Sequence, residues 1–156
     1  MRIGLGFDVH PLATERKLIL GGVEIPYHLG LSGHSDADVI IHALCDALLG
    51  AIGAGDIGEH FPDTDPKYKD IASTKLLQSV LDFMRTAKYR ISNLDFTIIA
   101  NHPRLSPYKE KIKESLAREL KIEKSQLNIK ASTTNGLPLG FEDGIAAYSV
   151  VLLEKE

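Results

Sequence analysis

The chain is poor in cysteine and has no long apolar run. Its one cysteine, Cys45, lies inside an apolar helical pattern, so no disulfide framework is present and a reducing compartment is expected. No apolar stretch approaches the roughly 20 residues that span a bilayer, and the amino terminus leads straight into a strand pattern instead of a cleavable leader. We expect a soluble, cytoplasmic protein that uses no membrane, or one of a plastid-type organelle if a targeting peptide has been removed.

Basic clusters, repeats and linkers are also missing. The formal net charge is −3 and the lysines and arginines are dispersed, which excludes a basic stripe for nucleic acid. A chain of 156 residues that is 44% apolar is long enough to bury one good core. We therefore predict a single domain over residues 1–156.

The hydrophobic periodicity mixes strands and helices. It predicts a strand at the amino terminus, two short strands about Gly21 and Gly22, and a helix that begins near Ser35 and ends at a glycine-rich stop. An amphipathic helix from about Ser73 and a strand over 93–100 follow. The last elements are a helix with Ser106 as N-cap and strands near 127–133 and 145–153. This order predicts an α/β (α+β) fold, a single mixed β-sheet packed by helices.

One face of that sheet needs a further cover. The stretch "IAAYSVVLL" is apolar on both faces and "LDFTIIA" is nearly so, although few helices are available. Burial of the second face against other subunits avoids an aggregation hazard, so we favour a homo-oligomer. The alternative is that the helices divide between both faces.

The amino-terminal strand "GLGFDVHPL" places an aspartate and a histidine on one side. Alternation puts Ile3, Leu5, Phe7 and Val9 on one face, which is typical of core, and puts Gly4, Gly6, Asp8 and His10 on the other. The glycines leave room for close approach to the backbone beside two potential metal ligands. The alternative is that Asp8 and His10 only hydrogen-bond each other at a strand end.

A third ligand would favour metal binding, and the following helix offers one. Asp38, His42 and Asp46 are four residues apart and share a helical face. One carboxylate and two imidazoles, from Asp8, His10 and His42, suit zinc or a similar divalent ion with an open coordination position. Asp46 either orients the His42 ring or is a salt-bridged surface residue. His34 and Ser35 lie at the predicted helix start, where free amides can receive a phosphate.

Six motifs occur together in order: "GFDVH", "GHSDADV", "HALCDALLGA", "DIGEHFPDTDP", "NLDFTIIANHPRLSP" and "NIKASTTNGL". In these the chain resembles the 2-C-methyl-D-erythritol 2,4-cyclodiphosphate synthase family of the non-mevalonate isoprenoid pathway. The resemblance implies a phosphorus-oxygen lyase that converts 4-diphosphocytidyl-2-C-methyl-D-erythritol 2-phosphate to the cyclodiphosphate and releases CMP. It also implies a homotrimer with active sites between neighbouring subunits and zinc at Asp8, His10 and His42.

The resemblance also implies roles for the remaining site residues. His34 and Thr133 would stabilise the transition state, and a second cation, Mg²⁺ or Mn²⁺, would bind with the substrate diphosphate. The implied substrate-binding residues are Ser35, Asp56, Ile57, Gly58, Phe61, Pro62, Asp63, Thr64, Asp65, Ala100, Asn101, His102, Pro103, Arg104, Leu105, Ser106, Ala131, Ser132, Thr134, Asn135 and Phe141.

Two positions depart from the family pattern. A glutamate that helps hold the second cation is usual where this chain has Asn135, and a longer arginine-containing segment is usual where it has "GFEDG". Asparagine offers a neutral oxygen without charge, which predicts weaker binding of the second cation. Two other classes stay open: a metal-dependent phosphohydrolase and a non-catalytic protein that binds cytidine nucleotides.

Overall fold

The computed structural model describes residues 1–141 and 143–156, and within them the chain forms strands and helices in a mixed order. The strands are β1 (Arg2–Ala13), β2 (Leu18–Leu20), β3 (Val23–Ile25), β4 (Gly30–Leu31), β5 (Tyr89–Ala100), β6 (Leu127–Ser132) and β7 (Gly144–Lys155). The α-helices are α1 (Val39–Ile52), α2 (Ile57–His60), α3 (Ser73–Thr86) and α4 (Lys109–Leu120). Short 3₁₀ turns occupy Pro66–Tyr68, Ser106–Tyr108 and Lys124–Gln126.

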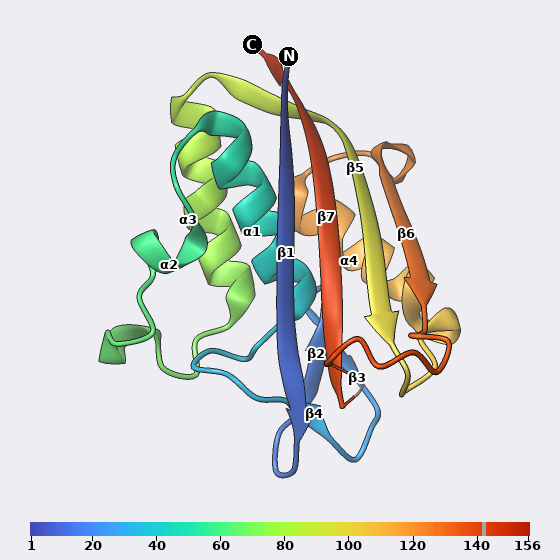
Figure 1. Ribbon diagram of the computed structural model, residues 1–156. Helices are drawn as coiled ribbons and strands as arrows, with labels where there is room; N and C mark the ends of the chain where they lie inside the picture. The colour runs from blue at the N-terminus through green and yellow to red at the C-terminus, as the bar shows by residue number, and fades with distance from the viewer. Residues whose placement is uncertain (142) are drawn as a thin grey trace.

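Five strands form one mixed sheet in the order β4-β1-β7-β5-β6. Strand β7 is antiparallel to both β1 and β5, whereas β5 and β6 are parallel. Helices α1, α3 and α4 all lie on the same side of this sheet (Figure 1), and the β2–β3 hairpin is a separate two-stranded ribbon. The predicted α/β fold with helices on one face is confirmed, and the alternative with helices on both faces is wrong.

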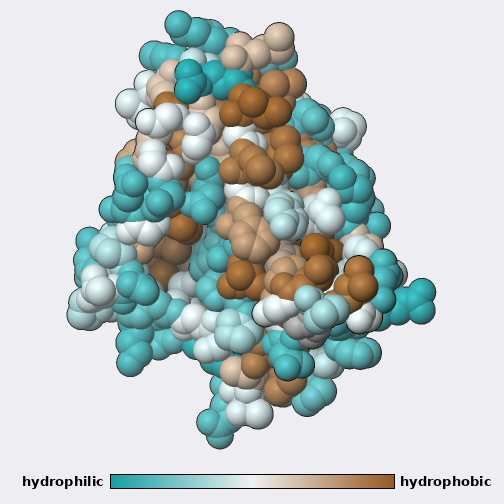
Figure 2. All heavy atoms as spheres, in the orientation of Figure 1, coloured by the Kyte–Doolittle hydropathy of each residue, from teal (hydrophilic) through white to brown (hydrophobic). Residues whose placement is uncertain are grey.

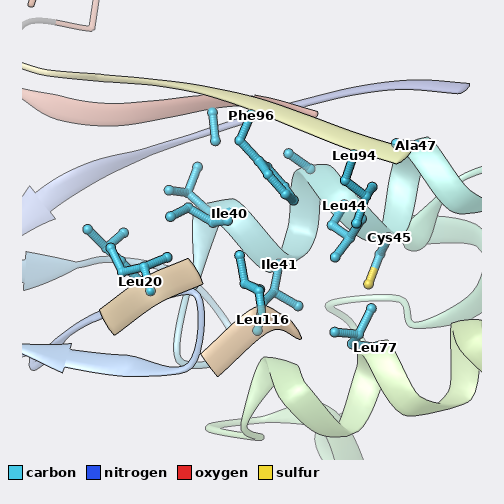
Figure 3. Close-up of a cluster of buried hydrophobic side chains, with 14 of the residues drawn as sticks. Leu20, Ile40, Ile41, Leu44, Cys45, Ala47, Leu77, Leu94, Phe96 and Leu116 are labelled. Atoms are coloured by element: carbon cyan, nitrogen blue, oxygen red, sulfur yellow. The ribbon is translucent and has the colours of Figure 1, made fainter. Parts of the chain in front are cut away.

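Helix α1 lies at the centre of the core. Ten of its fourteen residues are buried, and it packs against β1 and β7 on one side and α3 on the other. Figure 3 shows Ile40, Ile41 and Leu44 of this helix pointing in different directions toward Leu20, Leu116 and Phe96. A helix that is apolar over most of its circumference is expected to be buried on most sides, and the face with His42 and Asp46 is partly exposed.

The glycines of β1 allow this helix to lie directly on the sheet. A Cβ atom at Gly4 would lie 1.9 Å from the carbonyl oxygen of Ala47, and one at Gly6 would lie 1.8 Å from that of Ala43. The space that the glycines leave is therefore filled by the backbone of α1 and not by a ligand. This close contact brings the side chains of β1 and α1 together at the end of the strand.

The assignment of Ile3, Leu5, Phe7 and Val9 to the core is wrong for the single chain. These side chains point away from the helices, and Ile3 and Leu5 are 70% and 66% exposed. Tyr148 and Val150 of β7 are exposed beside them. Figure 2 shows the result as a brown band along β1 and β7, with hydrophilic residues on both sides. We call the six residues Ile3, Leu5, Phe7, Val9, Tyr148 and Val150 the outer apolar face.

Helix α1 begins later than the sequence predicts. Its N-cap is Asp38 and not a residue near Ser35. The fully buried Asp38 carboxylate accepts hydrogen bonds from the Ile41 amide and from the Gly21 and Gly22 amides of the β2–β3 turn. Burial raises the pKa of Asp38 to about 6, although these three amides act against the shift. Because the carboxylate occupies the helix start, His34 and Ser35 do not lie at a free helix N-terminus.

The predicted N-cap at Ser106 is also wrong. Ser106 is the first residue of a 3₁₀ turn, and α4 begins at Lys109 without a side-chain cap. The glycine stop after α1 is confirmed, since Gly53 adopts the left-handed conformation with a φ of 73°.

Candidate metal centre

Asp8, His10 and His42 converge at one point between β1 and α1. The Oδ2 atom of Asp8 lies 2.9 Å from Nε2 of His10 and 3.1 Å from Nδ1 of His42, and the two imidazole nitrogens are 3.2 Å apart. The three side chains are 14–25% exposed, so the cluster is partly buried and open on one side. One donor atom from each residue lies within 4.8 Å of the others, and such a group could hold a metal ion.

The charge of the cluster fits a cation. Burial raises the pKa of the Asp8 carboxyl, but the hydrogen bonds and charges of His10 and His42 outweigh it and hold the pKa well below its usual range. Burial lowers the pKa of His10, but the Asp8 carboxylate outweighs it and raises the pKa. Since metal ligands must give up their protons, binding of a cation at this cluster competes with protonation of its side chains.

The backbone before α1 orients His10. Its Nδ1 lies 2.9 Å from the carbonyl oxygen of Ser32, which only accepts, so Nδ1 donates and Nε2 is the nitrogen that faces Asp8 and His42. A Cβ atom at Gly33 would lie 3.1 Å from Cε1 of His10, so any residue other than glycine at this position would push the imidazole ring aside. The donor set, one carboxylate and two imidazoles that each direct one atom at the same point, therefore fits a divalent ion.

Asp46 makes no hydrogen bond to the ring of His42. Its Oδ1 accepts a hydrogen bond of 2.8 Å from the amide of Ile57 and so anchors the start of α2. Both predicted roles, orientation of His42 and a surface salt bridge, are wrong. The second ring nitrogen of His42 instead faces the hydroxyls of Ser35 and Ser73.

The loop after α1 lies next to the cluster. A cavity of about 530 Å³ is bounded by His10, His42 and the loop and helix segments around them. Of the residues implied to bind substrate, Ser35, Ile57, Gly58, Phe61, Pro62, Asp63 and Thr64 line it, together with His34. Asp56 caps α2 through the Glu59 amide, and the carbonyl oxygen of Asp65 accepts from Nε2 of His34 at 3.2 Å. We call this cavity the metal cleft. Its other lining residues, Gly33, Tyr68 and Leu76, were not predicted.

A second hollow lies at the ends of β5 and β6. Asn101, His102, Thr133 and Thr134 line it, with a volume of about 540 Å³. The Asn101 side-chain oxygen accepts hydrogen bonds from the amide and the hydroxyl of Thr134, at 3.0 and 3.2 Å. We call this hollow the β5–β6 pocket.

The other residues that the resemblance implies to bind substrate differ in their exposure. Ala100 and Leu105 are buried, while Pro103 is half-buried. Arg104, Ser106, Ala131 and Ser132 are exposed. Phe141 lines a third, smaller hollow with Val9 and His10. Residue 142 of the "GFEDG" segment lies outside the described residues.

Within one chain the metal cleft and the β5–β6 pocket are separate. They share no lining residue, and β1 and β6 are separated by β7 and β5. Three inter-strand spacings correspond to about 14 Å. His34 and Thr133, the two residues implied to act on one transition state, thus belong to different hollows of the chain.

Asn135 has a conformation that suits asparagine. Its φ of 54° lies in the left-handed region, which asparagine tolerates better than most residues. Its side-chain Oδ1 accepts a hydrogen bond from the hydroxyl of Thr133 at 3.2 Å, and its backbone N–H donates a hydrogen bond to the same hydroxyl at 3.1 Å. The amide side chain is therefore already engaged with the neighbouring threonine.

The fold and the cluster define the class of protein: a mixed α/β protein with a three-residue cluster that could hold a metal ion and that opens into a cleft. Among the described residues, no helix is long and apolar enough to cross a membrane. The chain belongs to the YgbB family, whose model matches residues 1–154.

Several relatives of the chain carry the same name. It is 57% identical to the 2-C-methyl-D-erythritol 2,4-cyclodiphosphate synthase of Geotalea uraniireducens over 100% of both chains. It is equally identical to that of Syntrophotalea carbinolica, over 99% of this chain and 95% of the relative. A solved structure of such a synthase in a CDP-bound form superposes with a TM-score of 0.91 at 35% identity, over 98% of this chain and 100% of the other. The family predicted from the six motifs is confirmed.

Proposed function

We propose that the whole chain, as one domain, converts 4-diphosphocytidyl-2-C-methyl-D-erythritol 2-phosphate to 2-C-methyl-D-erythritol 2,4-cyclodiphosphate and releases CMP. The observation that carries the proposal is the Asp8, His10 and His42 cluster at the metal cleft of a chain that is 57% identical to enzymes named for this product. The reaction makes it a phosphorus-oxygen lyase of non-mevalonate isoprenoid biosynthesis. Its one cysteine, a buried free thiol, is compatible with a cytoplasmic location.

The reaction needs no protein nucleophile. An oxygen of the 2-phosphate attacks the β-phosphorus, the bond from that phosphorus to the bridging oxygen breaks, and CMP leaves with the electron pair. The main obstacle is repulsion between two phosphates, so positioning and charge neutralisation supply the catalysis. A divalent ion at Asp8, His10 and His42, which we propose to be zinc, would supply that neutralisation when bound.

The protein would place the two halves of the substrate. Residues 61–64 line the metal cleft and would offer carboxylate and backbone oxygens to the polyol hydroxyls, and Asp56 and Asp65, which flank the lining segments in the chain, would complete the set. Residues 100–106 and 131–135 offer backbone groups and hydroxyls to the cytidine and its phosphates in the β5–β6 pocket. His34 and Thr133 would donate hydrogen bonds to phosphate oxygens at the point where charge develops.

A homotrimer would unite these halves. The metal cleft and the β5–β6 pocket share no lining residue in one chain, and a neighbouring subunit can bring its own β5–β6 pocket to the metal cleft. The outer apolar face supports assembly, because six exposed apolar side chains in one band are costly in water. We propose that this face is the contact between subunits.

The Leu5→Asp variant tests the assembly. Wild-type protein is expected to sediment at about three times the chain mass of 17.1 kDa, and the variant at the mass of one chain, because a carboxylate cannot be buried in an apolar interface. Phe83→Asp, which changes an equally apolar but separate exposed side chain on α3, is the control and should leave the mass unchanged. A wild-type protein that sediments as a single chain would contradict the trimer.

Phosphorus NMR tests the reaction. With zinc and magnesium supplied, the substrate signals should give way to those of CMP and a cyclic diphosphate. Release of inorganic phosphate would indicate a phosphohydrolase, and CMP binding without turnover would indicate a nucleotide-binding protein; either result would overturn the proposal.

The asparagine at position 135 should raise the concentration of the second cation that turnover requires. A neutral amide at the diphosphate gives a weaker Mg²⁺ or Mn²⁺ site than a carboxylate, so turnover should require more magnesium than in the Asn135→Glu variant. Titration of magnesium against turnover in both proteins measures this. The expected result is half-maximal activity at a lower magnesium concentration in the variant, and identical titration curves would refute the prediction.

A further inference from the structure

The segment between β4 and α1 supplies several residues of the metal cleft. Residues 31–35, which we call the cleft segment, contain His34 and Ser35, both of which line the cleft. The carbonyl oxygen of Ser32 in the same segment is the partner of His10. Beyond its first residue the cleft segment is neither helix nor strand, so contacts with other parts of the chain must fix its course.

Arg16 holds the cleft segment at both of its ends. It lies in the turn between β1 and β2, and its Nε donates a hydrogen bond of 3.0 Å to the carbonyl oxygen of Leu31. Its Nη2 donates one of 2.6 Å to the carbonyl oxygen of Ser35. The donors of a guanidinium have a fixed planar arrangement, so two acceptors that bind one guanidinium are also fixed relative to each other.

Asp70 contacts both Arg16 and the cleft segment. Its backbone amide donates a hydrogen bond of 2.8 Å to the carbonyl oxygen of His34, and its carboxylate lies 3.5 Å from Nη1 of Arg16. The Asp70 side chain is 67% exposed, so this ion pair contributes little by itself. The backbone of the cleft segment is thus bound on either side of His34 by Arg16 and at His34 itself by Asp70. A shift of this backbone would break hydrogen bonds to both residues.

Arg16 itself does not line the metal cleft. It lines a separate hollow of about 530 Å³, and Ser35 borders both hollows. The backbone of the turn lies directly against the start of β4, since a Cβ atom at Gly30 would lie 2.3 Å from the carbonyl oxygen of Lys17 and 2.5 Å from that of Arg16. The fold therefore brings Arg16 to the cleft segment from behind the site, without contact to a ligand in the cleft.

We propose that Arg16 is a positioning residue for the reaction, which holds the backbone of the cleft segment so that His34 and Ser35 face the metal cleft. The inference rests on the proposed function, in which His34 donates a hydrogen bond to a phosphate oxygen where charge develops. Arg16 acts through the carbonyl oxygens of Leu31 and Ser35 alone. A misplacement of about 1 Å at a reacting centre can cost about 100-fold in rate, even when its cause lies far from the chemistry.

Turnover of the Arg16→Ala variant tests the inference. At saturating zinc and magnesium we expect kcat to fall by a factor on the order of 10 to 100, with a smaller change in KM, because His34 would act on the transition state. Lys17→Ala is the matched control, since Lys17 is the next residue, lines the same hollow and pairs with Glu24 of β3. It should keep the wild-type kcat. A wild-type kcat in Arg16→Ala would overturn the inference, whereas a wild type without turnover would overturn the proposed function.

Hydrogen exchange gives a readout that does not depend on turnover. The amide of Asp36 donates to the carbonyl oxygen of Ile71 at 3.1 Å, and that of Asp70 donates to His34, so these two amides report on the contact between the cleft segment and residues 70–71. Both should exchange faster in Arg16→Ala, while the amides of β5 and β7 keep their wild-type rates. Faster exchange throughout the chain would indicate a general loss of structure and would contradict a positioning role.

The Arg16→Lys variant provides the test if the alanine variant does not fold. Lysine keeps the charge and an apolar stem, but an ammonium on a flexible stem does not fix two acceptors as a planar guanidinium does. We expect a smaller fall in kcat than for alanine and faster exchange at the same two amides, Asp36 and Asp70. Wild-type kcat together with wild-type exchange in Arg16→Lys would contradict the inference.

Discussion

Replacement of His42 by alanine is expected to abolish turnover and to lower zinc affinity by more than the roughly 100-fold that follows the loss of an orienting group. Nδ1 of His42 lies 3.1 and 3.2 Å from the donor atoms of Asp8 and His10, so its loss leaves two ligands of three. Two ligands do not hold zinc well enough for catalysis. Phosphorus NMR measures the turnover, and metal analysis after gel filtration measures the zinc that remains bound.

The control for this experiment is His28→Ala. His28 is exposed in the loop between β3 and β4 and lies apart from the cluster, so its loss should change neither turnover nor bound zinc. A His42→Ala protein that keeps one zinc per chain and turns over substrate at the wild-type rate would exclude the proposed site.

Replacement of Gly6 by alanine is expected to destabilise the fold by about 3–5 kcal/mol, which is at the upper end for one added methyl group. The new Cβ atom would lie 1.8 Å from the carbonyl oxygen of Ala43 and 2.7 Å from the backbone nitrogen of Ala47. Both are backbone atoms of α1, so no side chain can rotate to make room, and the helix must move off the sheet. Thermal and denaturant unfolding of the purified variant measure the loss.

Gly50→Ala provides the comparison. Gly50 is in the interior of α1, and nothing lies within 4 Å of an added Cβ atom. Because alanine favours a helix by about 1 kcal/mol over glycine, this variant should be as stable as wild type or slightly more so. Equal unfolding midpoints for Gly6→Ala and Gly50→Ala would show that the close contact between β1 and α1 is not a constraint.

The metal cluster could be predicted from the sequence because its geometry follows from two periodic patterns, the two-residue alternation of a strand and the apolar pattern of a buried helix. Residues two apart on a strand share a face, which joins Asp8 to His10, and the apolar pattern around His42 indicates a buried helix that packs on that strand. The structure brings these three side chains together. The same reasoning failed for Asp46. Its four-residue spacing from His42 indicates a common helical face, but it does not indicate that the Ile57 amide at the start of α2 is the partner of the Asp46 carboxylate.

The faces of β1 could not be assigned from its alternation. Alternation shows that two faces differ, but it does not show which of them the helices cover. Ile3, Leu5, Phe7 and Val9 have the composition of a core, yet they form most of the outer apolar face. The helices cover the glycine side instead, because only glycine allows the backbone of α1 to come so close.

The contact between Ser73 and His42 could not be predicted from the sequence for another reason. Ser73 is 31 residues from His42 in the chain, and the two meet only because α3 packs against α1. The sequence predicts the start of α3 correctly, but nothing in its local pattern indicates which side chain the first hydroxyl meets.

One face of β1 contacts α1 and the other is exposed and apolar, and this difference also limits how the length of the strand can change. Deletion of a single residue between Gly4 and His10 would exchange the faces of every residue on one side of the gap. Bulky side chains would then point at α1, and an aspartate or a histidine would point outward. We therefore expect natural variation in this segment to consist of substitutions, whereas insertions and deletions should accumulate in the loops.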